Sequence, residues 1–306
     1  MKSGTMWSRF LEKQIRKYDK GNAKMKIKSK WVPYAMLLPA LVLICIFKIY
    51  PVVSSFTDGF KYQGHFSLQV YKTLFHDKTF WNSLWVTTKF NLICIPLQVS
   101  VAFILAMLVN QNLRHIGIYR TIFYMPYAVS LTVATVIWSL MFNYNSGVLN
   151  SLLLKLGFES QGFLNDSKQA LYCIIVIASW KGCGYWMMFL LAGLKNIDPG
   201  LYEAAKIDGA GFWDTLFKIT IPLLKRVLLF VCIANTSSNV LLFAPMQLAT
   251  NGGPKDKTNV LMYEAYKSAF RFGNRSRSAA IISVLLMIII AVACIQAIVL
   301  GDKKDS

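Results

Sequence analysis

The feature that most constrains the fold is a series of six apolar stretches, each close to the length that crosses a bilayer. They cover residues 33–56, 82–109, 119–143, 171–194, 225–247 and 279–300. About twenty apolar residues in a helix span a hydrocarbon core of ~30 Å, and a helix satisfies its own backbone hydrogen bonds there. The mean hydropathy of +0.45 agrees with this interpretation. The sequence therefore predicts an all-α polytopic membrane protein.

The distribution of Lys and Arg predicts the orientation of these spans. Six spans place both termini on one side of the membrane. If that side is the cytoplasm, the inner segments hold 19 basic residues and the outer loops hold 11. An excess of basic residues in cytoplasmic segments is the usual pattern. We therefore expect cytoplasmic N- and C-termini, although the last outer loop, residues 248–278, is basic against this trend. The formal charge of +19 needs no nucleic acid to explain it.

Three regions follow from this pattern: a basic tail (1–30), a transmembrane domain (31–300) and a short C-terminal tail (301–306). The N-terminal tail has ten basic residues, with aromatic and aliphatic residues among them at helical spacing. This suits either an interfacial helix on an anionic membrane surface or a disordered basic tail. Both interpretations stay open at this point.

A polar interval at residues 195–222 separates the fourth and fifth spans. Its first part is a short helix expected to end near Asp208 and Gly209, because glycine accepts a left-handed cap. A second short helix carries Trp213, Phe217 and Ile221 on one stripe. Pro222 is expected at the start of the next span, where its missing N–H does no harm. The interval therefore predicts a helix-turn-helix with small residues that another protein could approach closely.

This interval resembles the EAA loop of permease subunits in binding-protein-dependent ABC sugar importers of the maltose-transporter type, the carbohydrate uptake class 1 family. The ordered motif is Glu203-Ala204-Ala205, Asp208-Gly209-Ala210, then Phe217, Ile219 and Pro222. The resemblance implies a loop that docks into a cleft on a separate ATPase subunit. The coupling residues that it implies are Tyr202, Glu203, Ala204, Ala205, Asp208, Gly209, Ala210 and Phe217.

The resemblance covers most of residues 33–300 and implies the type I importer fold with six helices. It also implies a bacterial cytoplasmic membrane location and several partners. These are a second, related permease chain, two copies of an ABC ATPase and an extracytoplasmic sugar-binding protein. The chain itself is expected to bind no cofactor, because it has no Gly-Lys dipeptide and hence no Walker A loop. ATP and Mg would bind to the ATPase. Phe243 is followed by Ala244-Pro245, where the family often has an acidic residue, so substrate identity is not carried over.

Polar residues within the fifth span are candidates for the substrate pathway. Asn235, Ser238 and Asn239 lie at i, i+3 and i+4, so they share one face of a helix. Uncharged donors and acceptors suit sugar hydroxyls, whereas Asn and Ser also hydrogen-bond between membrane helices. The resemblance favours sugar contacts in this part of the chain. Leu242 is assigned to the same pathway.

The fourth span offers a second set, Lys181, Gly182 and Tyr185. Gly182 and Gly184 are expected to open a pocket, with Trp180 and Tyr185 as flat faces for a sugar ring. Lys181 could face an anionic group. Lys89 and Asn91 in the second span are weaker candidates for the same passage.

Other function classes fit less well. Six cysteines lie in apolar segments without Cys-x-x-Cys spacing, and three scattered histidines form no ligand cluster. No catalytic motif is visible, which argues against a membrane-embedded enzyme. An ion-coupled secondary transporter would need midplane acidic residues, and the six spans contain essentially none. Within ABC permeases, a glycerol-phosphate-type or acidic sugar solute remains the alternative to a neutral sugar.

Overall fold

The computed structural model describes residues 13–14, 32–62, 65–111 and 114–300, and they form two compact units that divide between Ser55 and Phe56. The predicted interfacial helix in residues 1–30 lies almost wholly outside the described residues. The first unit holds α2 (Val32–Ile44), η1 (Cys45–Ile49) and the start of α3 (Tyr50–Asp58), which follow one another as a helical run. The apolar run Met36–Asp58, most of which belongs to this unit, is long enough to cross a membrane.

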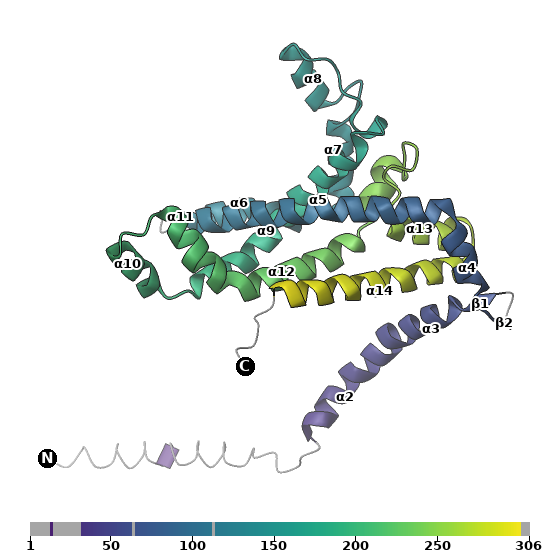
Figure 1. Ribbon diagram of the computed structural model, residues 1–306, viewed down its shortest axis with the longest axis horizontal. Helices are drawn as coiled ribbons and strands as arrows, with labels where there is room; N and C mark the ends of the chain where they lie inside the picture. The colour runs from purple at the N-terminus through teal and green to yellow at the C-terminus, as the bar shows by residue number, and fades with distance from the viewer. Residues whose placement is uncertain (1–12, 15–31, 63–64, 112–113, 301–306) are drawn as a thin grey trace. The chain divides into compact units, whose positions relative to one another are not determined.

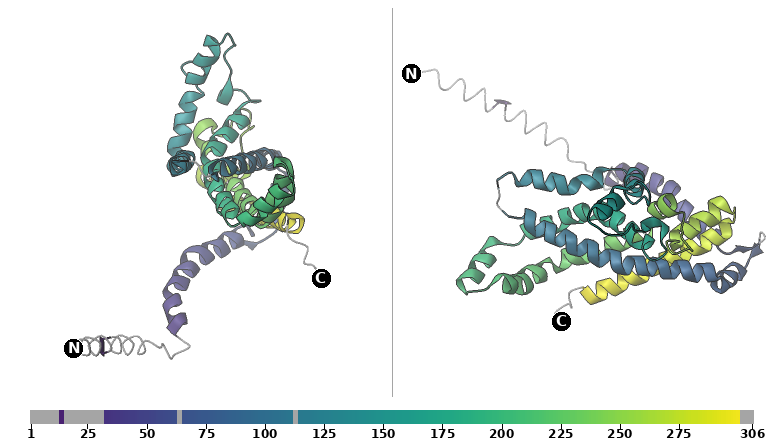
Figure 2. Two further views of the ribbon diagram at one scale, coloured as in Figure 1. Left: turned by 90° about the vertical axis from the view of Figure 1, so that its left-hand side faces the viewer. Right: turned by 90° about the horizontal axis from the view of Figure 1, so that it is seen from above.

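The second unit is a helical bundle built around α5 (Lys78–Val109), α9 (Ala170–Lys195), α12 (Ile221–Val240) and α14 (Arg275–Leu300). Figures 1 and 2 show these helices running side by side along the bundle. The most extensive pairing is that of α5 with α9, and α12 packs on α5, α9 and α14. We call the two ends of the bundle the α10 end and the α13 end, after the short helices found there.

The shorter elements lie mainly at these ends. α10 (Pro199–Ile207), α11 (Phe212–Thr215) and η3 (Leu216–Thr220) connect α9 to α12 at the α10 end. The remaining elements are β1 (Lys61–Tyr62), β2 (His65–Phe66), α4 (Gln69–His76), α6 (Ile116–Ala128), α7 (Leu131–Met141), α8 (Val148–Lys155), η2 (Phe163–Asn165), η4 (Met246–Thr250), α13 (Leu261–Tyr266) and η5 (Lys267–Arg271). The two strands pair antiparallel, with Lys61 opposite Phe66.

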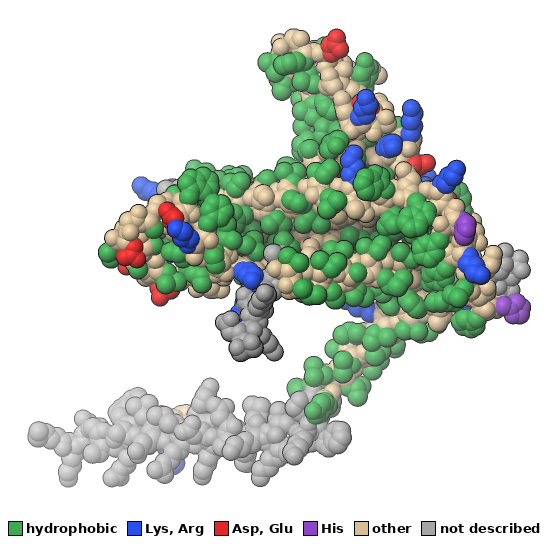
Figure 3. All heavy atoms as spheres, in the orientation of Figure 1, with side chains coloured by type: hydrophobic (Ala, Val, Ile, Leu, Met, Phe, Trp, Pro, Cys, Tyr) green, Lys and Arg blue, Asp and Glu red, His purple; other side chains and the backbone are tan. Residues whose placement is uncertain are grey.

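Apolar side chains fill the spaces between the long helices and also cover much of the outside. Phe90 and Tyr263 are fully buried toward the α13 end, and Leu190 and Leu224 are fully buried toward the α10 end. On the face drawn in Figure 3, hydrophobic side chains cover the bundle flank and most charged side chains lie at its ends and in its loops. An apolar flank between charged ends is the surface expected of a protein that crosses a bilayer.

The third predicted span, residues 119–143, is not one straight helix. It is divided into α6 and α7, which meet at an angle of 93°. The helix α6 has 13 residues, about 20 Å at 1.5 Å per residue, which is shorter than a ~30 Å hydrocarbon core. The expectation of one continuous helix across residues 119–143 was therefore wrong, because a hydropathy pattern reports apolar composition and not the direction of the chain.

The fifth predicted span, residues 225–247, also has different bounds. α12 ends at Val240, and helical structure resumes only at Ala244. Among the described residues, four helices are long and apolar enough to cross a membrane, and there are five if the bent pair α6–α7 forms one broken span. α12 has 20 residues but carries the polar run from Asn235 to Asn239. Such residues are tolerated at membrane depth where they face a cavity or a neighbouring helix.

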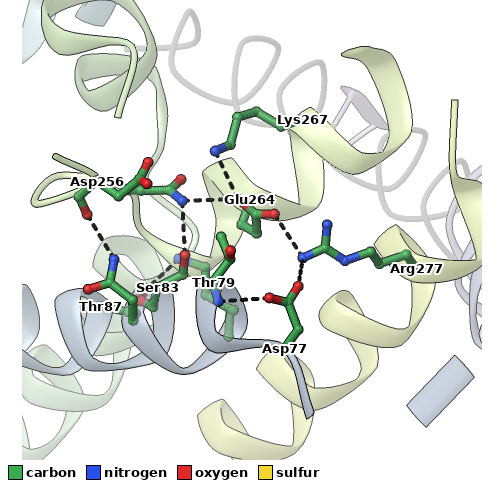
Figure 4. Close-up of polar contacts among 11 residues, drawn as sticks. Asp77, Thr79, Ser83, Thr87, Asp256, Glu264, Lys267 and Arg277 are labelled. Atoms are coloured by element: carbon green, nitrogen blue, oxygen red, sulfur yellow. Dashed lines mark hydrogen bonds and ion pairs between the residues drawn. The ribbon is translucent and has the colours of Figure 1, made fainter. Parts of the chain in front are cut away.

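A network of polar side chains joins α5, α13 and α14 at the α13 end (Figure 4). The Glu264 carboxylate, on a side chain only 2% exposed, lies 2.9 Å from the Lys267 ammonium and 3.0 Å from the Arg277 guanidinium. Arg277 also pairs with Asp77 at 2.6 Å. Asn259 donates to both Glu264 and Ser83, which connects α5 to this cluster. Each buried charge therefore has a partner of opposite sign, as burial requires.

Candidate substrate cavity and docking loop

A cavity of about 290 Å³ lies among α5, α6, α9 and α12, midway along the bundle. All seven residues predicted for the substrate pathway line it: Lys181, Gly182, Tyr185, Asn235, Ser238, Asn239 and Leu242. They come from α9, α12 and the turn after α12. The nearest two across the helices, Tyr185 and Asn235, are 50 residues apart in sequence. The structure therefore brings the two predicted sets together in one place. Whether substrate passes there stays a prediction.

Three amide side chains form the polar wall of the cavity. The Asn239 amide nitrogen donates to Gln98 at 3.0 Å and to Asn235 at 2.9 Å. The Asn235 amide nitrogen has no hydrogen-bond partner, although Asn235 is only 1% exposed. A buried donor without a partner costs free energy unless a ligand or water accepts from it. These three amides are uncharged and leave one donor unused, which suits a hydroxylated solute.

Gln98 on α5 was missed by the sequence interpretation, although it lines the cavity and is only 2% exposed. A Cβ atom at Gly182 would lie 3.1 Å from the Gln98 amide nitrogen, so glycine at this position makes room for that amide. Gly184 has another role, because a Cβ there would lie 2.0 Å from the Phe123 carbonyl oxygen on α6. Gly184 therefore permits close packing of α6 on α9 and does not open the cavity.

Lys181 is held by the break between α6 and α7. Its ammonium donates to the Tyr127 carbonyl at 2.8 Å and to the Val129 carbonyl at 2.6 Å. It also lies 5.0 Å from the centre of the Tyr127 ring. Carbonyls at a helix C-terminus lack intrahelical partners and attract cations. Lys181 therefore stabilises the end of α6, and two of its three donors are already used.

The two aromatic residues singled out in the fourth span, Trp180 and Tyr185, lie in different environments. The Tyr185 ring stacks on Tyr127 with centroids 4.3 Å apart, and both line the cavity. One face of Tyr185 is therefore covered by another ring of the same chain. Trp180 does not line the cavity and packs edge-on against Trp138 at 5.9 Å. The expectation that both aromatic rings flank one pocket was wrong.

The weaker candidates on the second span also lie elsewhere. The Asn91 amide donates to the Thr87 carbonyl within α5, and Lys89 lies 5.2 Å from the centre of the Tyr172 ring. Neither residue lines the cavity.

We call residues 195–222 the candidate docking loop, and it has the turn that the sequence predicted. Asp198 caps the start of α10 by accepting from the Gly200 backbone N–H, with Pro199 at the first position. At the other end Gly209 has a φ of 77°. The Gly209 N–H donates to the Lys206 carbonyl and the Ala210 N–H to the Ala205 carbonyl, the two bonds of a Schellman cap. Gly209 therefore closes α10 through a conformation that other residues adopt poorly.

The surface of this loop combines a groove with exposed apolar side chains. The groove, of about 440 Å³, is lined by Leu201, Ala204, Ala205, Asp208, Gly209, Ala210, Asp214, Lys218 and Ile219. Glu203 is exposed beside it, whereas the Tyr202 hydroxyl points inward to Thr220 at 3.3 Å. Phe217 is 60% exposed and stacks on Trp213, which is 67% exposed. Large exposed apolar groups that gather in one patch are typical of a protein interface.

The second half of the loop differs from the prediction. α11, η3 and α12 follow one another without a break from Phe212 to Val240, so no separate second helix ends before Pro222. The π-helical segment η3 directly precedes Pro222. A wider turn accommodates a residue that has no N–H to donate to the preceding turn. Pro222 therefore lies within the helical run instead of starting it.

The sequence of residues 98–301 matches the family described as the binding-protein-dependent transport system inner membrane component. The chain belongs to this family. It is therefore a permease, a multi-pass transport subunit of an inner membrane, and the predicted ABC permease fold is confirmed. The match spans the cavity helices α9 and α12 and the docking loop.

Relatives of this permease agree along most of its length. It is 37% identical over 276 residues to a probable ABC transporter permease of Pyrococcus horikoshii, covering 87% of this chain and 94% of that one. It is 35% identical over 272 residues to the lactose transport system permease LacF of Rhizobium radiobacter, covering 85% and 90%. It is 32% identical over 277 residues to the sn-glycerol-3-phosphate transport system permease UgpA of Shigella flexneri, covering 88% and 94%.

Solved structures share the fold. A chain of a bacterial alginate ABC transporter, crystallised with a periplasmic protein bound to an alginate pentasaccharide, superposes with a TM-score of 0.79 at 21% identity. The match covers 88% of this permease and 94% of that chain. A second alginate importer structure gives the same score and covers 93% of the permease and all of the other chain.

Proposed function

We propose that this permease forms half of a translocation pathway for a neutral sugar or oligosaccharide, and that the substrate passes through the cavity between α9 and α12. The observation that carries the proposal is the chemistry of the cavity wall. Its polar groups are three amides and the hydroxyls of Ser238, Tyr127 and Tyr185, and its one cation, Lys181, is held by two backbone carbonyls. The relatives are named for lactose and for glycerol phosphate, and a wall whose one cation already has two backbone partners favours the first of these two solute classes.

The partners follow from the same proposal. An extracytoplasmic sugar-binding protein delivers the solute, and a second, related permease chain completes the pathway. The helix-turn-helix at the α10 end faces the cytoplasm, together with both termini, and docks on one of two ABC ATPase subunits. ATP and Mg bind to the ATPase and not to this chain. The groove and the exposed pair Trp213–Phe217 support this docking role. ATP binding must stabilise one orientation of the cavity over the other, because a ligand without differential affinity shifts nothing.

A cysteine at Ser238 tests the pathway. Ser238 is exposed to the cavity, and its hydroxyl bonds only to the Ala234 carbonyl of its own helix. In a background without native cysteines, Ser238→Cys should support uptake until a bulky thiol reagent modifies it, and transported sugar should slow that modification. Ser237→Cys is the matched control, because Ser237 makes the same type of bond to Ile233 but does not line the cavity. Unimpaired uptake after complete modification of Ser238→Cys would refute the pathway.

Solute competition tests the substrate class separately. Uptake of a labelled neutral oligosaccharide, a glycerol phosphate ester and a uronate oligosaccharide should be compared in the assembled transporter, with its own binding protein. We expect only the neutral solute to be transported. Transport of a charged solute alone would contradict the neutral-sugar assignment, while the cysteine result would still stand for the route.

A further inference from the structure

A second hollow, of about 400 Å³, lies at the α13 end of the bundle between the start of α5 and the start of α9. It has three lysines and two large aromatic residues in its wall. The lining residues are Asn82, Trp85, Val86, Lys89, Ser167, Lys168, Leu171, Tyr172 and Lys257. We call it the lysine pocket. No part of the family assignment accounts for it, since the docking loop and the cavity are elsewhere.

The three ammonium groups of the lysine pocket have no acidic partner among the described residues. No carboxylate lines the pocket, and no ion pair joins a carboxylate of the described chain to Lys89, Lys168 or Lys257. Asp166 uses its carboxylate to accept from the backbone N–H of Lys168. By contrast, Lys267 and Arg277 at the same end pair with Glu264. Three cations gathered in one hollow without an anion form a site for an external anion.

The depth of the pocket along α5 matches the level of lipid headgroups. Residues 90–109 contain no charged side chain and are about twenty in number, the length that crosses a hydrocarbon core. Lys89 directly precedes this run, and we therefore place its ammonium at the membrane boundary. Trp85 is 64% exposed and Tyr172 is 46% exposed at the same level. Trp and Tyr concentrate at the interface between lipid and water.

The lysine pocket is separate from the candidate substrate cavity. Lys89 and Gln98 are nine residues apart on α5, a rotation of about two and a half turns at 3.6 residues per turn. They therefore lie on opposite faces of this helix. The two hollows share no lining residue. An anion in the lysine pocket therefore lies outside the route that we assign to the substrate.

We propose that the lysine pocket binds the headgroup of an anionic phospholipid in the leaflet at the α13 end. The phosphate lies among the ammonium groups of Lys89, Lys168 and Lys257, and the acyl chains run down the apolar flank of α5. Trp85 and Tyr172 pack beside the glycerol region. Attraction of basic groups to anionic lipid is additive over the lysines involved and weakens with salt. The pocket thereby gives this permease a preference for anionic over zwitterionic lipid.

Binding of a short-chain phosphatidylglycerol to the purified, assembled transporter tests the proposal by native mass spectrometry, with short-chain phosphatidylcholine as the reference lipid. The variant replaces Lys89, Lys168 and Lys257 together with Gln. The matched control replaces Lys72, Lys155 and Lys255, which are exposed and do not line the pocket. Both variants lose three positive charges. We expect about tenfold or greater loss of phosphatidylglycerol affinity in the pocket variant alone. The affinity for phosphatidylcholine should not change.

Each other outcome argues against the proposal. Equal phosphatidylglycerol affinity in the wild type and the pocket variant would overturn it, as would equal loss in the control variant. Displacement of phosphatidylglycerol by millimolar inorganic phosphate would show a site for a soluble anion instead of a lipid. If the triple variant does not assemble, Lys168→Gln with Lys257→Gln decides, because both side chains are exposed and their removal leaves the core unchanged.

Discussion

Gly209 offers a sharp test of the docking loop, because a substitution there acts through a single physical cause, backbone strain. Its φ of 77° is left-handed, and a Cβ atom built on it meets nothing within 4 Å. Any effect of a larger side chain is therefore backbone strain and not a clash. The left-handed conformation costs an L-residue about 1–2 kcal/mol. It costs least for Asn and most for β-branched residues.

The structure therefore predicts an order of function, Gly209 first, then Gly209→Asn, Gly209→Ala and Gly209→Val. A penalty of about 1–2 kcal/mol lowers the population of the docking-competent turn by roughly 5- to 30-fold. ATPase retained on the purified permease, and sugar-stimulated ATP hydrolysis per transporter, should fall in that order. The amount of permease in the membrane should stay constant, because the turn lies outside the bundle core.

Gly211→Ala is the matched control. Gly211 lies two residues further on, its Cβ would also meet nothing within 4 Å, and its φ is −74°. This conformation suits alanine, so we expect near-normal assembly and hydrolysis. Equal defects at both positions would refute the strain argument. Normal assembly and hydrolysis in Gly209→Val would refute the role of this turn in docking.

Three further predictions address other parts of the chain. Burial raises the pKa of Glu264, but hydrogen bonds from Asn259 and Lys267 and the nearby charges of Lys267 and Arg277 lower it, so that the pKa lies below its ordinary value overall. The ionised Glu264 carboxylate therefore stabilises the fold above about pH 4.5. This stabilisation is lost as the pH falls through the lowered folded-state pKa. Glu264→Gln should lower the thermal unfolding temperature at pH 7, and its difference from the wild type should vanish in acid; a pH-independent difference would contradict this. Lys181→Met should leave the Tyr127 and Val129 carbonyls without their donor, so backbone amides at the α6–α7 break should exchange hydrogen faster. Unchanged exchange there would show that the Lys181 ammonium does not stabilise the break. For the orientation, single cysteines replacing Ser160 and Lys255 should react with an impermeant reagent on intact cells, whereas one replacing Asp214 should react only after permeabilisation; the reverse pattern would invert the membrane topology.

Local chemistry decided which parts of this fold the sequence could predict. The Gly209 turn was predictable because one conformation of one residue type determines it. The polar face of Asn235, Ser238 and Asn239 followed from helical periodicity. The docking residues and the type of fold came from a resemblance in an ordered motif. These features need no knowledge of distant contacts.

Features that depend on distant segments were not predictable in this way. Gln98 is an isolated amide in an apolar run, and only the packing of α5 on α9 shows that it faces the cavity. Lys181 interacts with carbonyls more than fifty residues away, at a helix break inside a uniformly apolar stretch. The buried ion pairs of Glu264 had one local signal, Lys267 three residues later. Arg277 joins them only through the fold.

The unbroken helical run from Phe212 to Val240 has a mechanical consequence. It begins in the candidate docking loop and ends beside the cavity, so Trp213 and Asn235 are joined by a helical path with no intervening loop, about 30 Å long at 1.5 Å per residue. A tilt of about 10° at one end would move the other by about 5 Å, more than the length of a hydrogen bond. A flexible joint at Pro222 would have absorbed such a rotation. Because helical turns continue through Pro222, a movement of the loop is transmitted along the helix to the amides that line the cavity.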